Sequence, residues 1–154
     1  MPISIDIPGR APLALEHLLL DQNGTLTNRG TLIDGVAQRL RRVRERLHVH
    51  VLTADTFGTL DELVRELGVE GHRISTGAEK RAFANALGAQ RSVAIGNGTN
   101  DVPMLTVAAL GITVIGPEGT SAAAIAAADI VCGSILDAFE LLLDERALIA
   151  TLRA

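Results

Sequence analysis

Short apolar runs recur along this chain, and they end at a polar residue or a glycine. The clearest are residues 18–20 before Asp21, 49–52 before Thr53, and 92–95 before Gly96. Segments with apolar residues at helical spacing separate these runs. Short apolar runs of this kind are typical of strands buried on both faces, as in a parallel sheet covered by helices. This pattern predicts an α/β fold.

The expected elements follow one another along the whole chain. They are an initial hairpin feeding a central strand (3–20), helix 34–47, strand 49–52, helix 60–67, a short strand near 73–74, helix 79–87, strands 92–95 and 112–115, helix 121–128, strand 129–132 and helical material from 135 onward. Strands that alternate with helices imply right-handed crossovers. We therefore predict a single domain over residues 1–154, a three-layer, doubly wound (Rossmann-like) parallel sheet with an N-terminal β-hairpin.

Composition excludes several classes of protein. The 154 residues carry a formal net charge of −4, with 2% aromatic residues and neither Trp nor Tyr. An acidic chain without stacking side chains is a poor match to nucleic acid or to an anionic membrane. One cysteine, Cys132, cannot form an internal disulfide, and the first residues do not resemble a secretory signal. No run of apolar residues is long enough to span a membrane, so we expect a cytoplasmic protein.

The candidate functional residues stand at the ends of the apolar runs. In a doubly wound sheet, ligands bind outside the carboxyl ends of the strands, where Asp21, Thr53 and Gly96 are expected. Lys80 is the only lysine among fourteen basic residues. Two explanations stay open for it: chance in an arginine-rich chain, or a site that requires a compact ammonium group.

Four segments in this order resemble a known family. DQNGTLT from Asp21, Thr53 closing VHVLT, Lys80, and GNGTND with PML resemble the four motifs of the haloacid dehalogenase (HAD) superfamily of phosphoryl-transfer enzymes. GNGTNDVPML and the following LGITVIGPEGTSAAAIAAADIV resemble the phosphorylation domain of P-type ATPases. The whole chain resembles the small, soluble P-type-ATPase-like proteins of that superfamily, over roughly residues 16–145.

This resemblance implies a set of catalytic residues. An ionised carboxylate attacks phosphorus without a separate base, so Asp21 is the expected nucleophile and forms an aspartyl-phosphate. The position of Asn23 supplies a backbone carbonyl to a metal and, in relatives, an acid that protonates the leaving group; asparagine keeps only the first role. Thr53 and Lys80 would hold the phosphoryl group. Asp55, near the same edge, is either a substitute acid or a solvated loop residue.

The resemblance also implies binding residues. The Mg²⁺ ligands would be Asp21, Asn23, Asn97 and Asp101, and the substrate-binding residues would be Asn23, Gly24, Thr53, Ala54, Lys80 and Asn100. Asn97 stands where relatives usually carry an acid. Because Mg²⁺ prefers sites with carboxylates, the loss of this charge predicts weaker metal binding.

Two gaps show where relatives insert cap domains. Residues 28–52 and 54–79 separate Thr27, Thr53 and Lys80, and each gap holds only what the scaffold needs. We therefore expect a capless protein with an open site and a phosphorylated substrate of unknown identity. The resemblance implies that such proteins either admit large substrates or use a neighbouring subunit as a lid, so we also expect a homo-oligomer.

Two functions follow. The first is a Mg²⁺-dependent phosphohydrolase, slow because Asn23 and Asn97 replace acids; the alternative is a weak or inactive phosphoryl-binding switch or regulatory module. His17, His48, His50 and His72 show no metal-ligand spacing along the chain, and we interpret them as strand and surface residues.

Overall fold

The protein is described here over residues 2–154 by a computed structural model. Its centre is a parallel six-stranded sheet in the order β10-β9-β8-β3-β6-β7. The strands are β3 (His17–Asp21), β6 (His48–Thr53), β7 (Glu70–Arg73), β8 (Ser92–Gly96), β9 (Leu110–Val114) and β10 (Ile130–Cys132). The parallel sheet that was predicted from the apolar runs is therefore confirmed.

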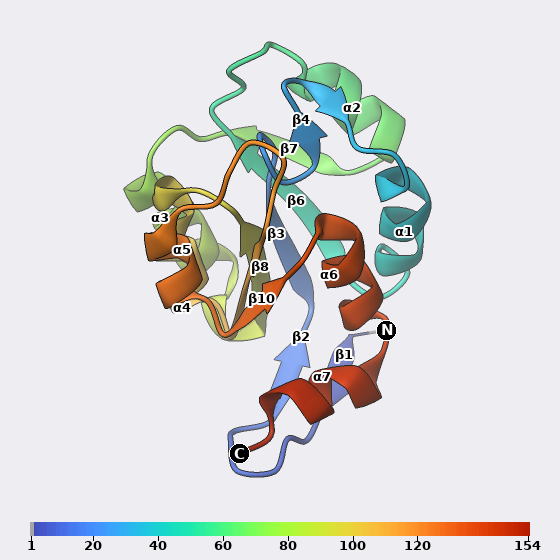
Figure 1. Cartoon of the computed structure of the whole chain (residues 1–154), viewed down its shortest axis with the longest axis vertical. Helices are drawn as coiled ribbons and strands as arrows, with labels where there is room; N and C mark the ends of the chain where they lie inside the picture. The colour runs from blue at the N-terminus through green and yellow to red at the C-terminus, as the bar shows by residue number, and fades with distance from the viewer. Residues whose placement is uncertain (1) are drawn as a thin grey trace.

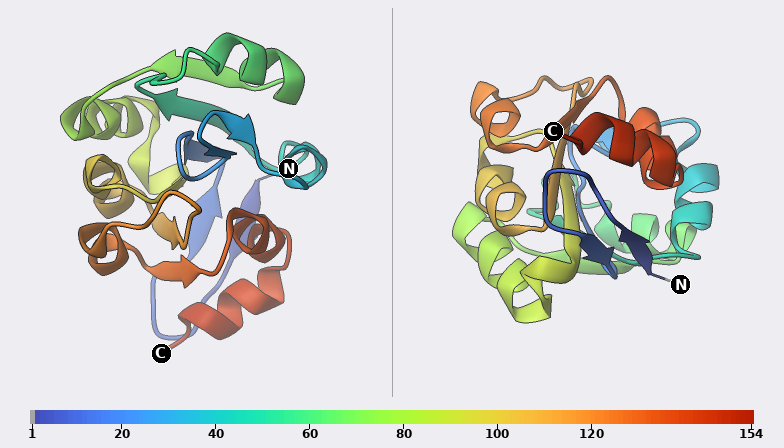
Figure 2. Two further views of the ribbon diagram at one scale, coloured as in Figure 1. Left: turned by 45° about the horizontal axis from the view of Figure 1, so that its top comes forward. Right: turned by 90° about the horizontal axis from the view of Figure 1, so that it is seen from below.

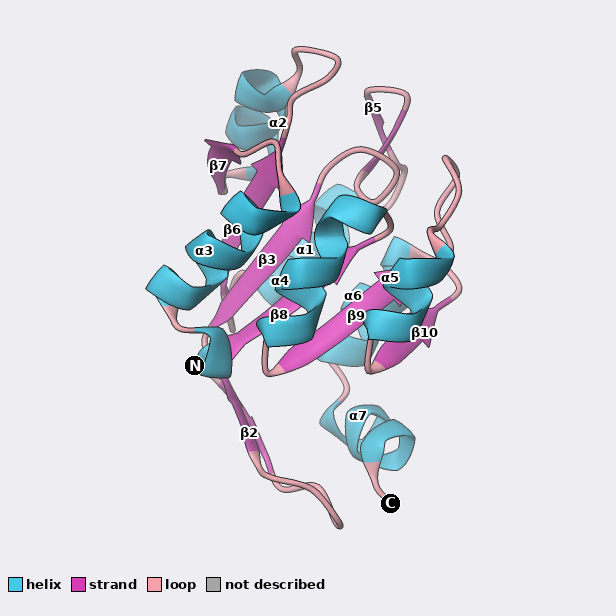
Figure 3. Cartoon of the chain, turned by 90° about the vertical axis from the view of Figure 1, so that its left-hand side faces the viewer, coloured by secondary structure: helices cyan, strands magenta, loops and turns pink. Residues whose placement is uncertain are grey.

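Helices cover both faces of this sheet, which gives the three expected layers (Figure 3). The helices are α1 (Val36–Val43), α2 (Leu60–Leu67), α3 (Gly77–Leu87), α4 (Val102–Val107), α5 (Ala122–Ala127), α6 (Ile135–Leu142) and α7 (Glu145–Leu152). Helices α3, α4 and α5 pack on one face over a small core around Leu19 and Leu52. Helices α1, α2 and α6 pack on the other face over a larger aliphatic core around Leu18 and Leu20.

The N-terminal hairpin forms a sheet of its own. Strand β1 (Ile3–Ile5) pairs antiparallel with β2 (Leu13–Leu15), and Glu16 separates this pair from β3. Figures 1 and 2 show the hairpin beside α7, at the end of the molecule opposite the carboxyl ends of the central strands. Apolar side chains from both join the larger core, so the hairpin closes the bottom of that core.

One predicted helix is shorter than expected. The apolar spacing predicts a helix over residues 34–47, but α1 covers only Val36–Val43. Gly35 at its N-cap has a φ of 90°, a left-handed conformation that cannot continue the helix. After Val43 the chain turns, and the N–H groups of Arg46 and Leu47 both bond to its carbonyl oxygen.

A second hairpin was not predicted. Strands β4 (Thr27–Asn28) and β5 (Thr31–Leu32) pair antiparallel directly after the Asp21 segment. Arg29 and Gly30 form the turn with φ values of 49° and 86°, as two-residue hairpin turns with two left-handed positions require. This hairpin, α1 and β6 account for residues 28–52, while α2, β7 and the start of α3 account for 54–79. Neither segment contains a cap domain, and no helix within residues 2–154 is long and apolar enough to cross a membrane.

Candidate active site

The carboxyl ends of three adjacent strands form the floor of the candidate site. Strand β3 lies between β6 and β8, so Asp21, Thr53 and Gly96 end at the same edge of the sheet. Helix α3 brings Lys80 to this edge, and the 3₁₀ helix η2 (Thr99–Asp101) brings Asp101. The short turn-rich segments after each strand therefore bring polar side chains together from distant parts of the chain.

Lys80 is the centre of this arrangement. Its side chain is fully buried, and its Nζ donates hydrogen bonds to Asp21 Oδ1 at 3.0 Å and to Asp101 Oδ1 at 2.6 Å. The hydroxyl of Thr76 accepts from the N–H of Glu79 and thereby caps α3. This cap starts the helix just before Lys80. The single lysine of the chain is thus an ion-pair partner of both acids.

The loop between β8 and α4 is wrapped around the Asp101 carboxylate. Asp101 Oδ2 accepts hydrogen bonds from the backbone N–H groups of Asn97 (3.1 Å) and Gly98 (2.9 Å). Gly96 leaves no space for a side chain, because a β-carbon there would collide with this carboxylate. The loop therefore fixes one oxygen of Asp101 and leaves the other to Lys80.

Burial and nearby charges shift the pKa values of Asp21 and Lys80. Burial, and after it the nearby charge of Asp101, raises the pKa of Asp21 to about 7 against the opposing effects of Lys80 and Thr25. Burial alone would lower the pKa of Lys80, but its two carboxylate partners raise it overall. Two carboxylates share one ammonium group, so the buried centre carries an excess negative charge that a cation would neutralise.

The oxygen atoms near this charge suit Mg²⁺. Besides the carboxylates of Asp21 and Asp101, the motif that begins at Asp21 supplies the backbone carbonyl oxygen of Asn23. Asn97 is held in place, since its Nδ2 donates to the Gly119 carbonyl at 2.9 Å. Carboxylate and amide oxygens are the hard ligands that Mg²⁺ prefers. The donor set therefore fits this metal.

Sequence reasoning did not single out Thr25, which links two of the candidate ligands. Its hydroxyl oxygen lies 3.1 Å from Asp21 Oδ2 and 3.2 Å from Asn97 Oδ1. A hydroxyl has one hydrogen, so Thr25 donates to one of these oxygens at a time. Its position in the sequence could have identified Thr25, because it lies four residues after Asp21 in the same motif. Gly24 beside it has a φ of 79°, which favours glycine at this turn.

The remaining candidates occupy different environments. Thr53 is buried, and its hydroxyl accepts from the N–H of Asp55 at 2.9 Å, which leaves its hydrogen for another acceptor. Ala54 is exposed beside it, and Asn100 is exposed on η2. The Asp55 carboxylate accepts from Leu60 N at 3.0 Å and pairs with Arg73 at 3.2 Å. Asp55 therefore binds the first N–H group of α2, and its side chain is only 8% exposed, so it is neither a free acid nor a solvated loop residue.

An open cleft of about 720 Å³ lies beside this centre and shares Thr25 with it. The β4–β5 hairpin forms one wall, and the segment after β9, with the start of α6, forms the other. Residues that line it include Asn28, Ile33, Ile115 and Leu136. The cleft places an accessible, partly apolar surface next to buried ionic groups.

Solved structures share this fold. A cobalt-bound deoxy-D-mannose-octulosonate 8-phosphate phosphatase from Haemophilus influenzae has a TM-score of 0.70 at 15% identity, covering 86% of this chain and 88% of that chain. A second structure is a 3-deoxy-D-manno-octulosonate 8-phosphate phosphatase from Moraxella catarrhalis, in complex with a magnesium ion, a phosphate ion and a KDO molecule. It has a TM-score of 0.64 at 20% identity, and the match covers 90% of this chain and 94% of that chain.

Part of an ion-transporting ATPase also has a similar structure. A zinc-transporting P-type ATPase in its E2·Pi state has a TM-score of 0.60 at 24% identity over 79% of this chain, but over only 19% of the transporter. The protein therefore has the fold of the HAD superfamily, and the suspected resemblance is confirmed at the level of the fold.

Sequence comparison defines a narrower group. No family model matches the chain. The uncharacterized protein MJ0073 of Methanocaldococcus jannaschii is 50% identical over 64 residues, which cover 42% of this chain and 69% of that protein. The uncharacterized protein MJ0072 of the same organism is 44% identical over 39 residues, which cover 25% of this chain and 89% of that protein. The chain belongs to the same family as these two archaeal proteins.

Proposed function

We propose that this protein is a Mg²⁺-dependent phosphohydrolase that acts through an aspartyl-phosphate on Asp21. The observation that carries the proposal is the buried ion-pair triad in which Lys80 holds Asp21 and Asp101 at one edge of the sheet. Pairs of perturbed ionisable groups at a strand-end edge are typical of active sites. The phosphatases with this fold support the same class of reaction.

In the proposed reaction, a carboxylate oxygen of Asp21 attacks the phosphorus of a phosphate ester or anhydride. The bond from phosphorus to the leaving oxygen breaks, and that oxygen takes the electron pair. Water then attacks the aspartyl-phosphate, which releases inorganic phosphate and regenerates the carboxylate. Lys80 and the hydroxyl of Thr53 stabilise the charge on the phosphoryl oxygens, and Lys80 also opposes the rise that burial causes in the pKa of Asp21, which favours the ionised form that attacks.

The metal would be held by Asp21, Asp101, Asn97 and the backbone carbonyl of Asn23. When bound, Mg²⁺ would neutralise negative charge on the phosphoryl group and on the attacking carboxylate. The excess negative charge of the triad supports this assignment. A magnesium complex and a cobalt-bound form among the phosphatases of this fold also support a divalent metal.

We expect slow turnover because Asn23 cannot protonate the leaving group. A general acid typically contributes 10² to 10⁴-fold, so phosphate anhydrides and aryl phosphates should react faster than sugar phosphates. Asp55 does not offer a substitute acid, since its carboxylate accepts a hydrogen bond from Leu60 N at the start of α2 and pairs with Arg73. Asn23→Asp should raise kcat for esters with poor leaving groups by roughly 10²-fold or more, and should change the rates for acyl phosphates far less.

The test is a screen of phosphate esters and acyl phosphates with Mg²⁺, run side by side with Asp21→Asn. Hydrolysis that requires Mg²⁺ and disappears in the variant supports the proposal. Hydrolysis that Asp21→Asn retains would show that another group carries the reaction.

A second candidate function is a phosphoryl-binding switch that forms a long-lived aspartyl-phosphate. The two asparagines, Asn23 and Asn97, favour it, because both stand where relatives have an acid. Titration with beryllium fluoride, a phosphoryl mimic, separates the candidates. Tight Mg²⁺-dependent binding without steady turnover supports the switch, whereas repeated turnover supports the hydrolase.

The substrate would be a phosphorylated molecule that reaches the open site, and a second subunit would complete its cover. Ile115, which lines the cleft, and Val131, on the edge strand β10, expose about half of their surface, at 51% and 48%. Apolar side chains of this kind are common in subunit contacts. Light scattering during size-exclusion chromatography should give a homo-oligomer; a monomer at all concentrations would exclude the lid.

A further inference from the structure

All four histidines of the chain lie together on one face of the sheet. His17 is on β3, His48 and His50 are on β6, and His72 is on β7, which are three adjacent strands. The ring centroids of His17 and His50 are 5.6 Å apart, and those of His50 and His72 are 5.7 Å apart. Phe83 of α3 lies against two of them, with its ring centroid 5.6 Å from that of His50 and 4.5 Å from that of His72.

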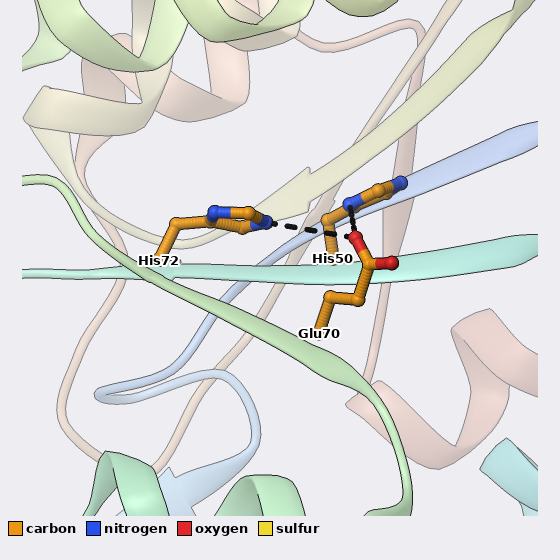
Figure 4. Close-up of side chains that lie close together, drawn as sticks. All are labelled: His50, Glu70 and His72. Atoms are coloured by element: carbon orange, nitrogen blue, oxygen red, sulfur yellow. Dashed lines mark ion pairs between the residues drawn. The ribbon is translucent and has the colours of Figure 1, made fainter.

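Glu70 completes a compact group with two of these histidines. It pairs with His50 across the β6–β7 register, and its Oε2 lies 3.1 Å from His50 Nδ1 and 3.9 Å from His72 Nε2. The three ligand atoms all lie within 4.8 Å of one another. Figure 4 shows both rings directed toward the carboxylate, which lies between them.

The nitrogen atoms in this group lack hydrogen-bond partners. Both ring nitrogens of His50 and Nε2 of His72 are buried and unpartnered, although His50 Nδ1 is close to Glu70, because the orientation does not form a hydrogen bond. The His50 side chain is only 8% exposed. A buried polar group without a partner is costly, so such a group in a native fold calls for an explanation, and a bound ion is one that accounts for all three nitrogens.

We propose that His50, Glu70 and His72 bind a divalent transition-metal ion, with Zn²⁺ as the best match. Two imidazoles and one carboxylate are a recognised zinc ligand set, in which a water molecule or a substrate fills the fourth position. The nitrogen donors favour such a metal over Mg²⁺. Glu70 is 70% exposed and His72 is 32% exposed at the side chain, so the metal has a path from solvent.

The position of this group separates it from the Asp21 centre. His50 precedes Thr53 by three residues, roughly 10 Å along the strand. The histidine site is therefore separate from the Asp21 centre and has different donor atoms. A bound ion would fasten the edge strand β7 to β6.

The experiment is a Zn²⁺ titration of the metal-stripped chain in excess Mg²⁺, which occupies the hard-oxygen site. Glu70→Gln and His72→Gln each remove one ligand from an accessible position. His48→Gln and Glu66→Gln are matched controls, since both side chains are exposed and lie outside the three-residue group. Calorimetry gives stoichiometry and affinity, visible absorption after Co²⁺ substitution gives the geometry, and circular dichroism checks that each variant is folded.

We expect one equivalent of Zn²⁺ with a tetrahedral Co²⁺ spectrum, and a loss of at least about tenfold in affinity in Glu70→Gln and His72→Gln. The two control variants should bind as the unmodified chain does. Absence of stoichiometric binding, or binding of equal affinity in the folded Glu70→Gln and His72→Gln variants, would overturn the proposal.

Discussion

Replacing Asp21 with asparagine should abolish catalysis and, in the absence of metal, make the fold more stable at neutral pH. Asp21 is buried beside Asp101, and both carboxylates share the ammonium group of Lys80. The introduced asparagine keeps the shape and an oxygen that accepts from Lys80, but it removes one negative charge. The remaining Lys80–Asp101 pair is then balanced, whereas the native centre has an excess negative charge.

The size of the effect follows from the raised pKa of Asp21. Its pKa rises from 3.8 to about 7 on folding, and since each tenfold change in proton affinity is worth about 1.4 kcal/mol, ionisation costs the native state up to about 4 kcal/mol. Because the folded pKa lies above the unfolded one, this cost is absent below pH 4 and grows as the pH rises toward 7. In a chain of this size, 4 kcal/mol corresponds to roughly 8–16 °C in Tm.

The assay is thermal and urea unfolding of both proteins between pH 4 and pH 8, with a chelator present. The stability difference should be close to zero at pH 4 and should favour Asp21→Asn increasingly up to pH 7–8. Mg²⁺ should reduce this difference, since it binds the native carboxylate. A variant that is less stable than the parent at pH 8, or a difference that does not change with pH, would refute the reasoning.

Three further substitutions test neighbouring contacts. Asn97→Asp adds a negative charge to the metal loop and should tighten Mg²⁺ binding by roughly tenfold in calorimetry; unchanged affinity would remove Asn97 from the ligand set. Thr25→Val deletes a hydrogen bond that lowers the pKa of Asp21, so the acidic limb of the pH–rate profile should move to higher pH, and an unmoved limb would contradict this role. Lys80→Met leaves two buried carboxylates without their ammonium partner and should cost about 3–5 kcal/mol near pH 7.5, less at pH 5 where Asp21, with its raised pKa, takes up a proton, as urea unfolding would show; an equal loss at both pH values would contradict the ion-pair account.

Much of the fold can be predicted because strands buried on both faces carry a strong signal. The runs ending at Asp21, Thr53 and Gly96 are almost wholly apolar, with His50 as the one polar residue inside them, so both their strand character and their parallel packing follow from the sequence. The β4–β5 hairpin was missed because two-residue strands are too short to show any periodicity. Its turn depends on Arg29 in a left-handed conformation, which arginine seldom adopts.

The sequence predicts the site residues that stand at the ends of strands. It does not predict contacts between side chains on neighbouring strands. Asp21 and Asp101 follow apolar strands or a glycine-rich loop, which the sequence displays. The histidines show no regular spacing along the chain, and their contacts arise from the order β3-β6-β7 and from strand register. Local sequence does not determine the order of strands in a sheet, so a group such as His50, Glu70 and His72 can be recognised only from the structure.

The most direct test of the proposed chemistry is to trap the phosphoryl group on the chain. The protein is mixed with an acyl phosphate and Mg²⁺, quenched in acid, and digested for mass spectrometry, with Asp21→Asn treated identically. We predict the added mass of one phosphoryl group on the peptide that contains Asp21, dependent on Mg²⁺ and absent from the variant. Hydrolysis that proceeds with no label on Asp21, or a label that persists in Asp21→Asn, would contradict the assignment of Asp21 as the phosphoryl acceptor.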